Sequence, residues 1–507
     1  MTTSPSFMPI TISSGIRASA ARTPSKVALS EDKRSLTYAQ LVENIDRVET
    51  LASVGLQLKP GEHVALMAPN CIEFIEIVCG LADAGLATAM VNPRLTAKEA
   101  AYICNDSQAQ VLFVHASLEE VARAASLETV REIIVIGKDY AQRLAASSPQ
   151  KSHLRIAETD IFALPYTAGT TGQPKGVLLP HRSRVLTFFS MAVEYGCYSI
   201  DDRSLAIAPL YHGAGFAFAM APIFFGGTCE ILPKFEPELV LERLMTLNIT
   251  NTFMVPTHFN ALFGLGEATL KKYQCPALKT IISNAAPLPQ ATKQRIVNYF
   301  GAGILHETYG STEGGIVCNL RPADQLRKIQ CVGMPFPCTE VRLLDTSGKE
   351  VPQGEVGELY SRSPFLFSGY WGKPEASKEA FKGEWMTVGD MARKDEEGFI
   401  YLVDRKKDLI ISGGVNIYPR EIEEVLHAHP AVAEAAVIGV PDDYWGEAVK
   451  AYVACRKGVT VTKEELIAFC QTSLAGFKLP KTIEFIDMLP RNAAGKVLKT
   501  ELRQPPK

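Results

Sequence analysis

Apolar residues in the first four hundred positions of the chain follow two patterns that alternate along the sequence. Short continuous apolar runs, which predict buried strands, are VLFVHA from Val111, IIVIG from Ile133, SLAIAPL from Ser204, TFMVP from Thr252 and TIISNA from Thr280. Longer runs with helical spacing predict helices over residues 38–52, 71–84, 98–105, 237–247 and 290–300. Strands that alternate with helices are typical of βαβ units, so we expect a large α/β domain with largely parallel sheets.

The pattern changes between residues 333 and 401. The short apolar runs VRLLD, GELYSR and GFIYLVD are separated here by the turn-rich stretches TSGKEVPQGEVG and KDEEG. Short strands with turn signals between them predict a small antiparallel or barrel-like unit. We expect this unit to form the last part of an N-terminal domain over residues 1–404.

A second domain is predicted after the charged run DRKKD, residues 404–408. A helix is expected from Pro419, with Pro430 marking its end. The strand-like run AVAEAAVIGV and a helix from Lys463 follow it. We therefore expect a small α+β domain over residues 408–507, which is a usual size for a domain.

Length and net charge limit the class of protein. With 507 residues, of which 47% are hydrophobic, the chain is too long for one core and can fill several. The formal net charge of −3 gives no bulk electrostatic reason to expect a nucleic acid or an anionic membrane as a partner. We therefore expect no nucleic acid among the partners.

Cysteine spacing and hydropathy indicate a cytoplasmic protein. The 11 cysteines include no CxxC pair, which favours reduced, mostly buried thiols over a zinc site or a disulfide framework. The N-terminus has no basic segment followed by an apolar core, so we expect no signal peptide. The uncharged stretch of residues 213–227 is short for a bilayer span and contains Pro222, so we expect a buried segment and no integral membrane segment.

The stretch YTAGTTGQPKG, residues 166–176, is a candidate phosphate loop. In a Walker motif the lysine directly follows a glycine. Here Gln173 and Pro174 lie between Gly172 and Lys175, so the loop differs from that motif. The groups that can surround a triphosphate are the backbone amides at Gly169 and Gly172, the hydroxyls of Thr167, Thr170 and Thr171, and the ammonium of Lys175. From the loop alone, a mobile surface loop is an equally good interpretation. The apolar IFAL before it favours a loop at a strand end, where open α/β sheets bind ligands.

Five motifs together carry a family resemblance. They are YTAGTTGQPKG, YGSTEGG, GEWMTVGDMA, YLVDRKKDLIISGGVNIYPREIEEVL and PRNAAGKVLK. Their order and approximate spacing resemble those of adenylate-forming acyl-CoA synthetases over nearly the whole chain, and their wording is most similar to bacterial benzoate-type and fatty-acid CoA ligases. The resemblance implies that ATP, Mg²⁺ and a small-molecule carboxylic acid give an acyl-adenylate and pyrophosphate, after which coenzyme A gives the acyl-CoA and AMP.

The resemblance also implies roles for the phosphate-binding residues. The loop from Thr167 to Lys175 would hold the β- and γ-phosphates, Thr312 would lie near the α-phosphate, and Glu313 would help to hold Mg²⁺. Attack of a carboxylate on a phosphate brings two anions together, so such a site needs cations. Alone, Glu313 would read as an exposed loop carboxylate.

The resemblance also implies nucleoside contacts, from the predicted N-terminal domain and the first residue of the hinge. Tyr309 would stack on adenine, and the stretch NAAP, comprising Asn284, Ala285, Ala286 and Pro287, would border it. Asp390 would accept both ribose hydroxyls, with Arg405 near the ribose. Spacing alone leaves a core tyrosine and a simple turn as the competing interpretations of Tyr309 and Asp390.

The small domain is expected to move between the two half-reactions. By resemblance, Lys496 bridges the acyl carboxylate and the α-phosphate during adenylation, although a lysine near a C-terminus is ordinarily just solvated. The hinge would lie at residues 405–407, with Lys407 at the hinge position. Gly413 and Gly414 would then let the pantetheine arm of coenzyme A pass, unless this pair is only a turn.

The acyl pocket is expected to be lined by residues of three segments. These are His212 at the mouth, counted with Lys496, Thr312 and Glu313 as catalytic, together with Gly213, Ala214, Phe253, Gly310, Gly314 and Gly315. Small residues here predict a roomy cavity and an apolar fatty or substituted aromatic acid longer or bulkier than benzoate. No basic residue lies in these segments to pair with a second carboxylate, which weighs against a dicarboxylate.

Two other functions stay open at this point. A related adenylating enzyme passes its acyl group to a carrier protein instead of coenzyme A. A catalytically silent nucleotide-binding protein would be expected to lose Lys496 or Glu313, and both are present. The sequence also leaves the oligomeric state open, a homodimer included.

Overall fold

The computed structural model describes residues 8–150, 154–167, 173–413, 415–491 and 497–503. The chain forms two compact units: a large unit of Met1–Val341 with Ser361–Met386, and a small unit of Arg342–Tyr360 with Thr387–Lys507. The domain boundaries predicted at residues 404 and 408 separate parts that are expected to move, whereas these two units are defined by packing. The predicted boundaries therefore stay a prediction.

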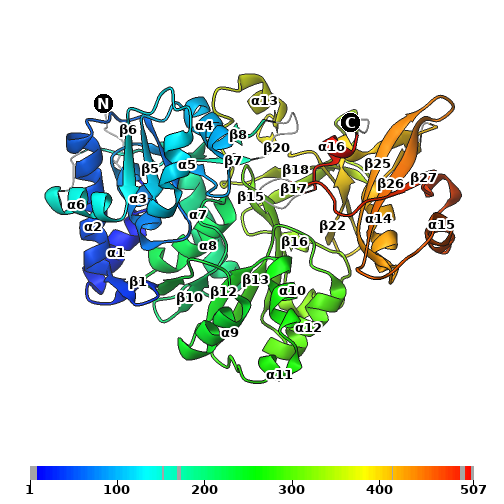
Figure 1. Ribbon diagram of the computed structural model, residues 1–507, viewed down its shortest axis with the longest axis horizontal. Helices are drawn as coiled ribbons and strands as arrows, with labels where there is room; N and C mark the ends of the chain where they lie inside the picture. The colour runs from blue at the N-terminus through cyan, green and yellow to red at the C-terminus, as the bar shows by residue number, and fades with distance from the viewer. Residues whose placement is uncertain (1–7, 151–153, 168–172, 414, 492–496, 504–507) are drawn as a thin grey trace, which may run out of the picture. The chain divides into compact units, whose positions relative to one another are not determined.

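The first sheet of the large unit has seven strands in the order β6-β5-β3-β4-β7-β8, with β9 also paired to β7. Figure 1 labels β5, β6, β7 and β8 of this sheet. They are β3 (His63–Met67), β4 (Ala87–Val91), β5 (Val111–His115), β6 (Glu132–Ile136), β7 (Ile161–Thr167), β8 (Lys175–Gly176) and β9 (Leu179–Pro180). The strands from β6 to β7 are parallel, whereas β8 and β9 run antiparallel to β7. Helices α4 (Ala97–Asp106) and α5 (Glu119–Ala124) bury Ala100, Ile103 and Ala122 against this sheet.

The second sheet has nine strands in the order β16-β15-β14-β13-β12-β10-β11-β1-β2. They are β1 (Val27–Glu31), β2 (Arg34–Thr37), β10 (Arg203–Ala206), β11 (Thr228–Ile231), β12 (Asn251–Met254), β13 (Thr280–Ser283), β14 (Leu305–Ser311), β15 (Gly315–Leu320) and β16 (Met334–Pro335). Its middle, from β14 to β1, is parallel, and antiparallel partners close both edges. Three helices, α9 (Pro237–Thr246), α10 (Pro256–Gly264) and α12 (Gln290–Phe300), pack their apolar faces into one core cluster with strands of this sheet.

Helix α8 (Gly213–Phe224) lies in the core and contacts elements of both sheets. The ring of its Phe216 is centred 6.1 Å from Phe162 on β7, and the ring of its Phe218 is centred 4.1 Å from Phe253 on β12. A helix that is apolar on all sides is expected in such a buried place. The prediction of a buried segment at residues 213–227 is therefore confirmed.

The large unit contains further helices and a hairpin. They are α1 (Ser14–Arg22), α2 (Tyr38–Thr50), α3 (Ile72–Asp83), α6 (Lys138–Ala146), α7 (His181–Tyr195), α11 (Glu267–Leu270), α13 (Pro374–Glu379) and the hairpin of β19 (Phe381–Lys382) with β20 (Trp385–Met386). Of these, α3 and α7 are largely buried. Capping boxes begin two of the predicted helices, with Thr37 accepting from the Gln40 amide at α2 and Thr96 from the Glu99 amide at α4.

The predicted α/β architecture is confirmed. The helix predicted over residues 290–300 is α12, and those predicted over residues 38–52 and 71–84 are α2 and α3 with ends shifted by one or two residues. The five predicted strands are β5, β6, β10, β12 and β13, and all five lie in parallel ladders.

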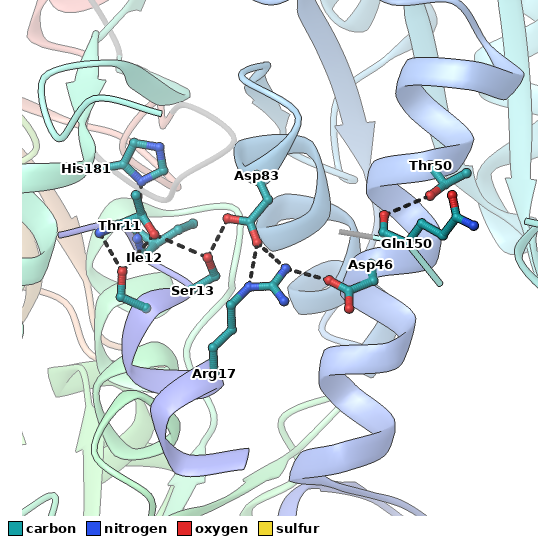
Figure 2. A network of polar contacts seen from close by, with 10 residues as sticks. Thr11, Ile12, Ser13, Arg17, Asp46, Thr50, Asp83, Gln150 and His181 are labelled. Carbon is teal, nitrogen blue, oxygen red and sulfur yellow. Dashed lines mark hydrogen bonds and ion pairs between the residues drawn. The ribbon is translucent and has the colours of Figure 1, made fainter. Parts of the chain in front are cut away.

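A polar network joins the first helix of the large unit to α2 and α3 (Figure 2). The Arg17 guanidinium on α1 lies 2.6 Å from Asp46 on α2 and 2.6 Å from Asp83 at the end of α3. Ser13 donates a further hydrogen bond to Asp83, and the amide of Ile12 donates to Nδ1 of His181 on α7 at 3.1 Å. Burial lowers the pKa of His181 to about 4, so the ring stays neutral and keeps this acceptor nitrogen.

The small unit contains antiparallel strands and an α+β layer. Its strands are β17 (Glu340–Leu344), β18 (Gly357–Arg362), β21 (Asp390–Lys394), β22 (Ile400–Arg405), β23 (Ile410–Ser412), β24 (Val415–Ile417), β25 (Val432–Asp442), β26 (Gly446–Cys455) and β27 (Thr482–Phe485). β21 pairs antiparallel with β18 and β22, and a separate sheet has the order β24-β23-β26-β25 with β27 paired to β26. Ile422 and Leu426 of α14 (Pro419–Ala428) and Leu466 of α15 (Lys463–Gln471) pack on this sheet, and α16 (Lys499–Leu502) comes last. The predicted helix from Pro419 and strand after it are confirmed.

The structure bears on the predictions about the cysteines and about membrane-spanning segments. All 11 cysteines are free and most are buried, as expected. Within the described residues, no helix is both long and apolar enough to cross a membrane.

We expect Arg17→Met to lower the free energy of unfolding by about 3 kcal/mol, because two largely buried carboxylates lose their common cation. The matched control is Arg123→Met, which breaks an exposed pair with Glu119 one helical turn away and should cost less than about 0.5 kcal/mol. Urea unfolding of both variants measures the difference. A loss for Arg17→Met no larger than that of the control would contradict the role of the network.

Candidate active site

The hairpin between β14 and β15 presents Thr312 and Glu313 at its turn. At Gly310 a Cβ atom would lie 2.1 Å from the carbonyl oxygen of Gly315, so only glycine allows the two strands to approach this closely. Gly315 has a φ of +66°, a left-handed conformation that glycine adopts without strain. The Ser311 hydroxyl accepts a 2.9 Å hydrogen bond from the Gly314 amide and completes the turn.

Glu313 is buried and is held by two contacts from residues 365–371. The Tyr370 hydroxyl donates to Oε1 of Glu313 at 2.9 Å, and the Phe367 amide donates to the Glu313 carbonyl at 2.8 Å. Burial and the nearby Glu313 charge both raise the pKa of Tyr370, which keeps the phenol protonated as a donor. The structure records no hydrogen bond from a described residue to Oε2, so this oxygen can serve another ligand.

Tyr370 also connects this carboxylate with the phosphate loop. The Lys175 ammonium lies 5.2 Å from the centre of the Tyr370 ring, in the range of a cation–π contact. Lys175 is paired across β7 and β8 with Thr167, so the two ends of the loop are adjacent. The sequence patterns did not single out Tyr370, and the aromatic-rich FLFSGYW is the signal that points to it.

Some predicted residues lie outside the described residues. In the phosphate loop these are Gly169, Thr170, Thr171 and Gly172, and in the small unit they are Gly414 and Lys496. Their roles stay predictions. The exit of the loop is described: the Tyr102 hydroxyl donates to the Pro174 carbonyl at 3.1 Å.

The beginning of α8 lies beside the Thr312 turn. A Cβ atom on Gly213 would be 3.5 Å from Cγ2 of Thr312, an ordinary contact that leaves room for a small side chain. His212 precedes this helix, and burial, with a smaller effect of the positive Arg94, lowers the pKa of the imidazole to about 4. His212 is therefore neutral at physiological pH. Ala214 follows Gly213 in the first turn of the helix.

The predicted acyl-pocket glycines of the hairpin have packing reasons of their own. A Cβ atom would lie 2.5 Å from the Met386 side chain at Gly314 and 2.8 Å from Cβ of Phe365 at Gly315. At Gly315 the left-handed backbone and the Phe365 contact therefore favour glycine whether or not a ligand binds there, whereas at Gly314 the flexible end of the Met386 side chain would have to move. Their place in an acyl pocket, together with that of Gly310, stays a prediction. Phe253 is buried and stacks on Phe218 of α8.

One basic residue near these segments was not expected. Arg184 of α7 is buried, and its Nη2 donates to the Thr312 carbonyl at 2.7 Å. Its Nη1 is 3.6 Å from the position of a Cβ on Gly315. The predicted acyl segments themselves contain no basic residue, as the sequence shows, but α7, which is distant from the hairpin segment in the sequence, brings Arg184 next to it in the fold.

The stretch predicted to border adenine follows the end of β13 and is firmly anchored. Within it, Ala285 has a φ of +77°, a conformation that costs a non-glycine residue about 1 kcal/mol. The next amide, that of Leu288, donates to Oε1 of Glu307 at 3.0 Å, and Glu307 forms a buried ion pair with Lys293 on α12. Strain held in place by its surroundings is typical of ligand sites. Tyr309 is half-buried on β14, two residues after Glu307.

In the small unit, the two residues predicted to contact ribose are neighbours. Asp390 begins β21 and Arg405 ends β22, and the ladder pairs them directly. Arg405 Nε lies 3.1 Å from Oδ1 of Asp390, which is mostly buried. The prediction that they act together on one ligand group is thus compatible with their positions.

The predicted hinge and pantetheine residues also lie in the small unit. Lys407 is in a short 3-10 turn, Lys406–Asp408, and burial lowers the pKa of its ammonium. Gly413 has a φ of +57°, and its amide donates to the Trp445 carbonyl at 2.7 Å. A Cβ atom at Gly413 would lie 2.7 Å from the Trp445 ring, so a larger residue would have to displace the indole.

The donor set fits the predicted Mg²⁺ only together with substrate oxygens. Within the described residues, no group of three or more His, Cys, Asp or Glu side chains is placed to hold a metal ion. Mg²⁺ commonly binds through one or two carboxylates with phosphate oxygens and water as the other ligands. Glu313, with one oxygen fixed by Tyr370, is suited to that kind of site.

Comparison with known proteins identifies the class. The family model described as AMP-binding enzyme matches residues 16–371, and the AMP-binding enzyme C-terminal domain matches residues 421–496. The chain therefore belongs to the AMP-binding enzyme family, whose members form an acyl-adenylate and then a CoA thioester. The predicted ligase class and the cofactors ATP, Mg²⁺ and coenzyme A are those of this family and are confirmed.

Individual relatives cover nearly the whole chain. A feruloyl-CoA synthase of Amycolatopsis sp is 36% identical over 485 residues, which are 95% of this chain and 96% of the relative. A long-chain-fatty-acid–CoA ligase of Bacillus subtilis (strain 168) is 34% identical and covers 97% of this chain and 94% of its own length. The solved o-succinylbenzoate CoA synthetase from Bacillus subtilis in complex with its acyl-adenylate has a TM-score of 0.86 and 27% identity, covering 97% of this chain and 98% of that one.

We expect Tyr370→Phe to raise KM for MgATP and to lower kcat/KM in the adenylation step about tenfold, because the hydrogen bond to the Glu313 carboxylate is lost. Tyr273→Phe removes a tyrosine–glutamate hydrogen bond of the same length to Glu238 at an exposed position and is the control. Acid-dependent exchange of labelled pyrophosphate into ATP measures both variants. Equal rates for wild type and Tyr370→Phe would contradict the assignment.

Proposed function

We propose that this chain is an ATP-dependent ligase that joins a carboxylic acid to coenzyme A, and that the acid has a largely apolar fatty or substituted aromatic skeleton. The observation that carries the proposal is the hairpin turn with Thr312 and Glu313, held by Tyr370, which also contacts Lys175. The relatives named for feruloyl and long-chain fatty acyl thioesters support the substrate class.

In the first half-reaction, a carboxylate oxygen attacks the α-phosphorus of ATP and the bond to pyrophosphate breaks. Lys175 and the phosphate loop bind the β- and γ-phosphates, which leave as pyrophosphate. The Thr312 hydroxyl lies near the α-phosphate. Mg²⁺, when bound at Glu313, neutralises the charge that accumulates on the phosphate oxygens. The role of Glu313 is to hold one ligand position in a fixed direction, because Tyr370 fixes its other oxygen.

In the second half-reaction, the sulfur of coenzyme A attacks the acyl carbon, AMP leaves, and the thiol proton is released. We propose that Asp390 and Arg405 hold the ribose and that Gly413 and Gly414 border the pantetheine arm. His212, which burial keeps neutral, contacts the acyl group. Residues 405–407 act as the hinge between an N-terminal domain over residues 1–404 and a mobile domain over residues 408–507.

We also propose a cytoplasmic location, since free thiols throughout the chain suit a reducing compartment. A nucleic acid is not an expected partner at a net charge of −3. A homodimer is compatible with the proposal, which needs no second copy.

Product analysis tests the proposed function directly. Incubation with ATP, Mg²⁺, coenzyme A and a series of aliphatic and substituted benzoic acids should yield AMP and an acyl-CoA, identified by mass spectrometry. An acyl-adenylate without thioester would favour a carrier-protein acceptor. Absence of both products with every acid would favour a silent nucleotide-binding protein.

For Lys496 we expect that Lys496→Ala reduces adenylation at least about 100-fold, because the cation that bridges carboxylate and phosphate is lost. Thioester formation from a pre-made acyl-adenylate should stay within about threefold of wild type. Lys499→Ala, three residues away, is the control. Equal loss in both half-reactions would contradict the role assigned to Lys496.

At the hinge we expect the opposite selectivity. Lys407→Pro restricts the backbone at the position where rotation is proposed, so thioester formation should fall more than adenylation. Single-turnover measurements of each half-reaction compare the two. A parallel fall in both rates would exclude a hinge at this residue.

A further inference from the structure

Arg184 is a buried cation whose hydrogen-bonding groups are mostly unused. Only 4% of the residue is exposed, and Nε is buried without a hydrogen-bond partner. The 2.7 Å bond from Nη2 to the Thr312 carbonyl is its one recorded hydrogen bond among the described residues. A guanidinium has five N–H donors in a planar fork that matches a carboxylate, so most of this fork finds no acceptor among the residues that the structure describes.

Lys293, another deeply buried basic side chain near the site, has the kind of carboxylate partner that Arg184 lacks among the described residues. Lys293 is 1% exposed and forms an ion pair with Glu307. No carboxylate among the described residues lies within ion-pairing distance of Arg184, although the more distant charge of Glu313 acts to raise the pKa of its guanidinium. Burial lowers the pKa of Arg184 to about 10, which still leaves it charged at neutral pH. A buried charge without a partner costs several kcal/mol, so a role that supplies an anion is expected.

The position of Arg184 connects it with the proposed acyl site. Its helix, α7, packs on α8, with the rings of Phe188 and Phe224 centred 5.6 Å apart. On the other side, its guanidinium contacts the hairpin at Thr312 and approaches Gly315. Gly213, at the start of α8, adjoins the same turn, because a Cβ atom on it would lie 3.5 Å from Cγ2 of Thr312, so residues of both predicted acyl-pocket groups meet at the turn that Arg184 contacts.

We propose that Arg184 binds a second carboxylate of the acid substrate, remote from the carboxylate that reacts. The inference rests on the proposed function, in which Lys496 supplies the cation for the reacting carboxylate. Arg184, a second cation that is buried next to the predicted acyl residues, then pairs with a second carboxylate of the same acid. The substrate class becomes a dicarboxylic acid with an apolar aliphatic or aromatic skeleton between its two carboxylates.

The test uses sets of acids with one skeleton and a distal carboxylate, carboxamide or methyl group. Wild type should show a kcat/KM for AMP formation about 100-fold higher for the distal carboxylate, because a buried charged donor rejects analogues that cannot accept its hydrogen bonds. Arg184→Met should reduce this preference to less than about tenfold and improve the methyl member relative to the carboxylate. Arg184→Lys, which keeps the charge but loses the fork, should be intermediate.

The control variant is Arg182→Met, on the same helix, where an exposed arginine pairs with Glu158. It should keep the wild-type preference. Thermal shifts of each variant with the acids alone, without ATP, give a readout that does not depend on turnover. The distal dicarboxylate should stabilise wild type and Arg182→Met but not Arg184→Met.

Three results would overturn the proposal. Wild type preferring the methyl member would do so, as would an equal loss with all three acids in a folded Arg184→Met, which would indicate a purely structural cation. Equal thermal stabilisation of wild type and Arg184→Met by the dicarboxylate would also do so. Failure of the ligase function itself differs from these, because no acid would then give AMP while the thermal shifts would still report binding.

Discussion

The close approach of the two strands at Gly310 and Gly315 is the constraint on which the site of the large unit depends. A Cβ at Gly310 would lie 2.1 Å from a backbone oxygen, so the hairpin exists only with glycine there. Its turn places Thr312 beside the start of α8 and Glu313 beside Tyr370. From distant parts of the sequence, Arg184 donates to the turn itself and Lys175 contacts the ring of Tyr370. The proposed phosphate-binding site thus rests on backbone packing, with side chains added around it.

Two kinds of buried cation occur in the large unit: those paired with carboxylates of the protein, and Arg184, for which we propose a ligand as the partner. Arg17 and Lys293 are each paired with carboxylates of the protein, and these pairs connect helices or anchor a strained loop. Arg184, 4% exposed, has no such pair among the described residues. The difference has a physical meaning, because the free energy of burying a cation must be offset by an anion from some source. In an enzyme of this family, the acid substrate is an anion that can supply it.

The sequence predicts elements and motifs better than it predicts neighbours. Helix α12 and the strands β5, β10 and β13 follow from hydropathy period and length, which are local properties. The motif residues Thr312 and Glu313 were found because they lie in one short stretch. Tyr370 and Arg184 were not, because each acts through a contact with a turn that is 57 or 128 residues away. The packing reason for Gly314 also depends on a distant residue, Met386, and no local pattern contains it.

The most direct test of the account is the position of the catalytic cation. A crystal of the protein grown with Mn²⁺ and a non-hydrolysable ATP analogue, with diffraction data collected at the manganese absorption edge, locates the metal without reference to activity. The account predicts one anomalous peak about 2.2 Å from a carboxylate oxygen of Glu313, with phosphate oxygens as further ligands. A well-ordered analogue whose metal lies away from Glu313 would contradict it.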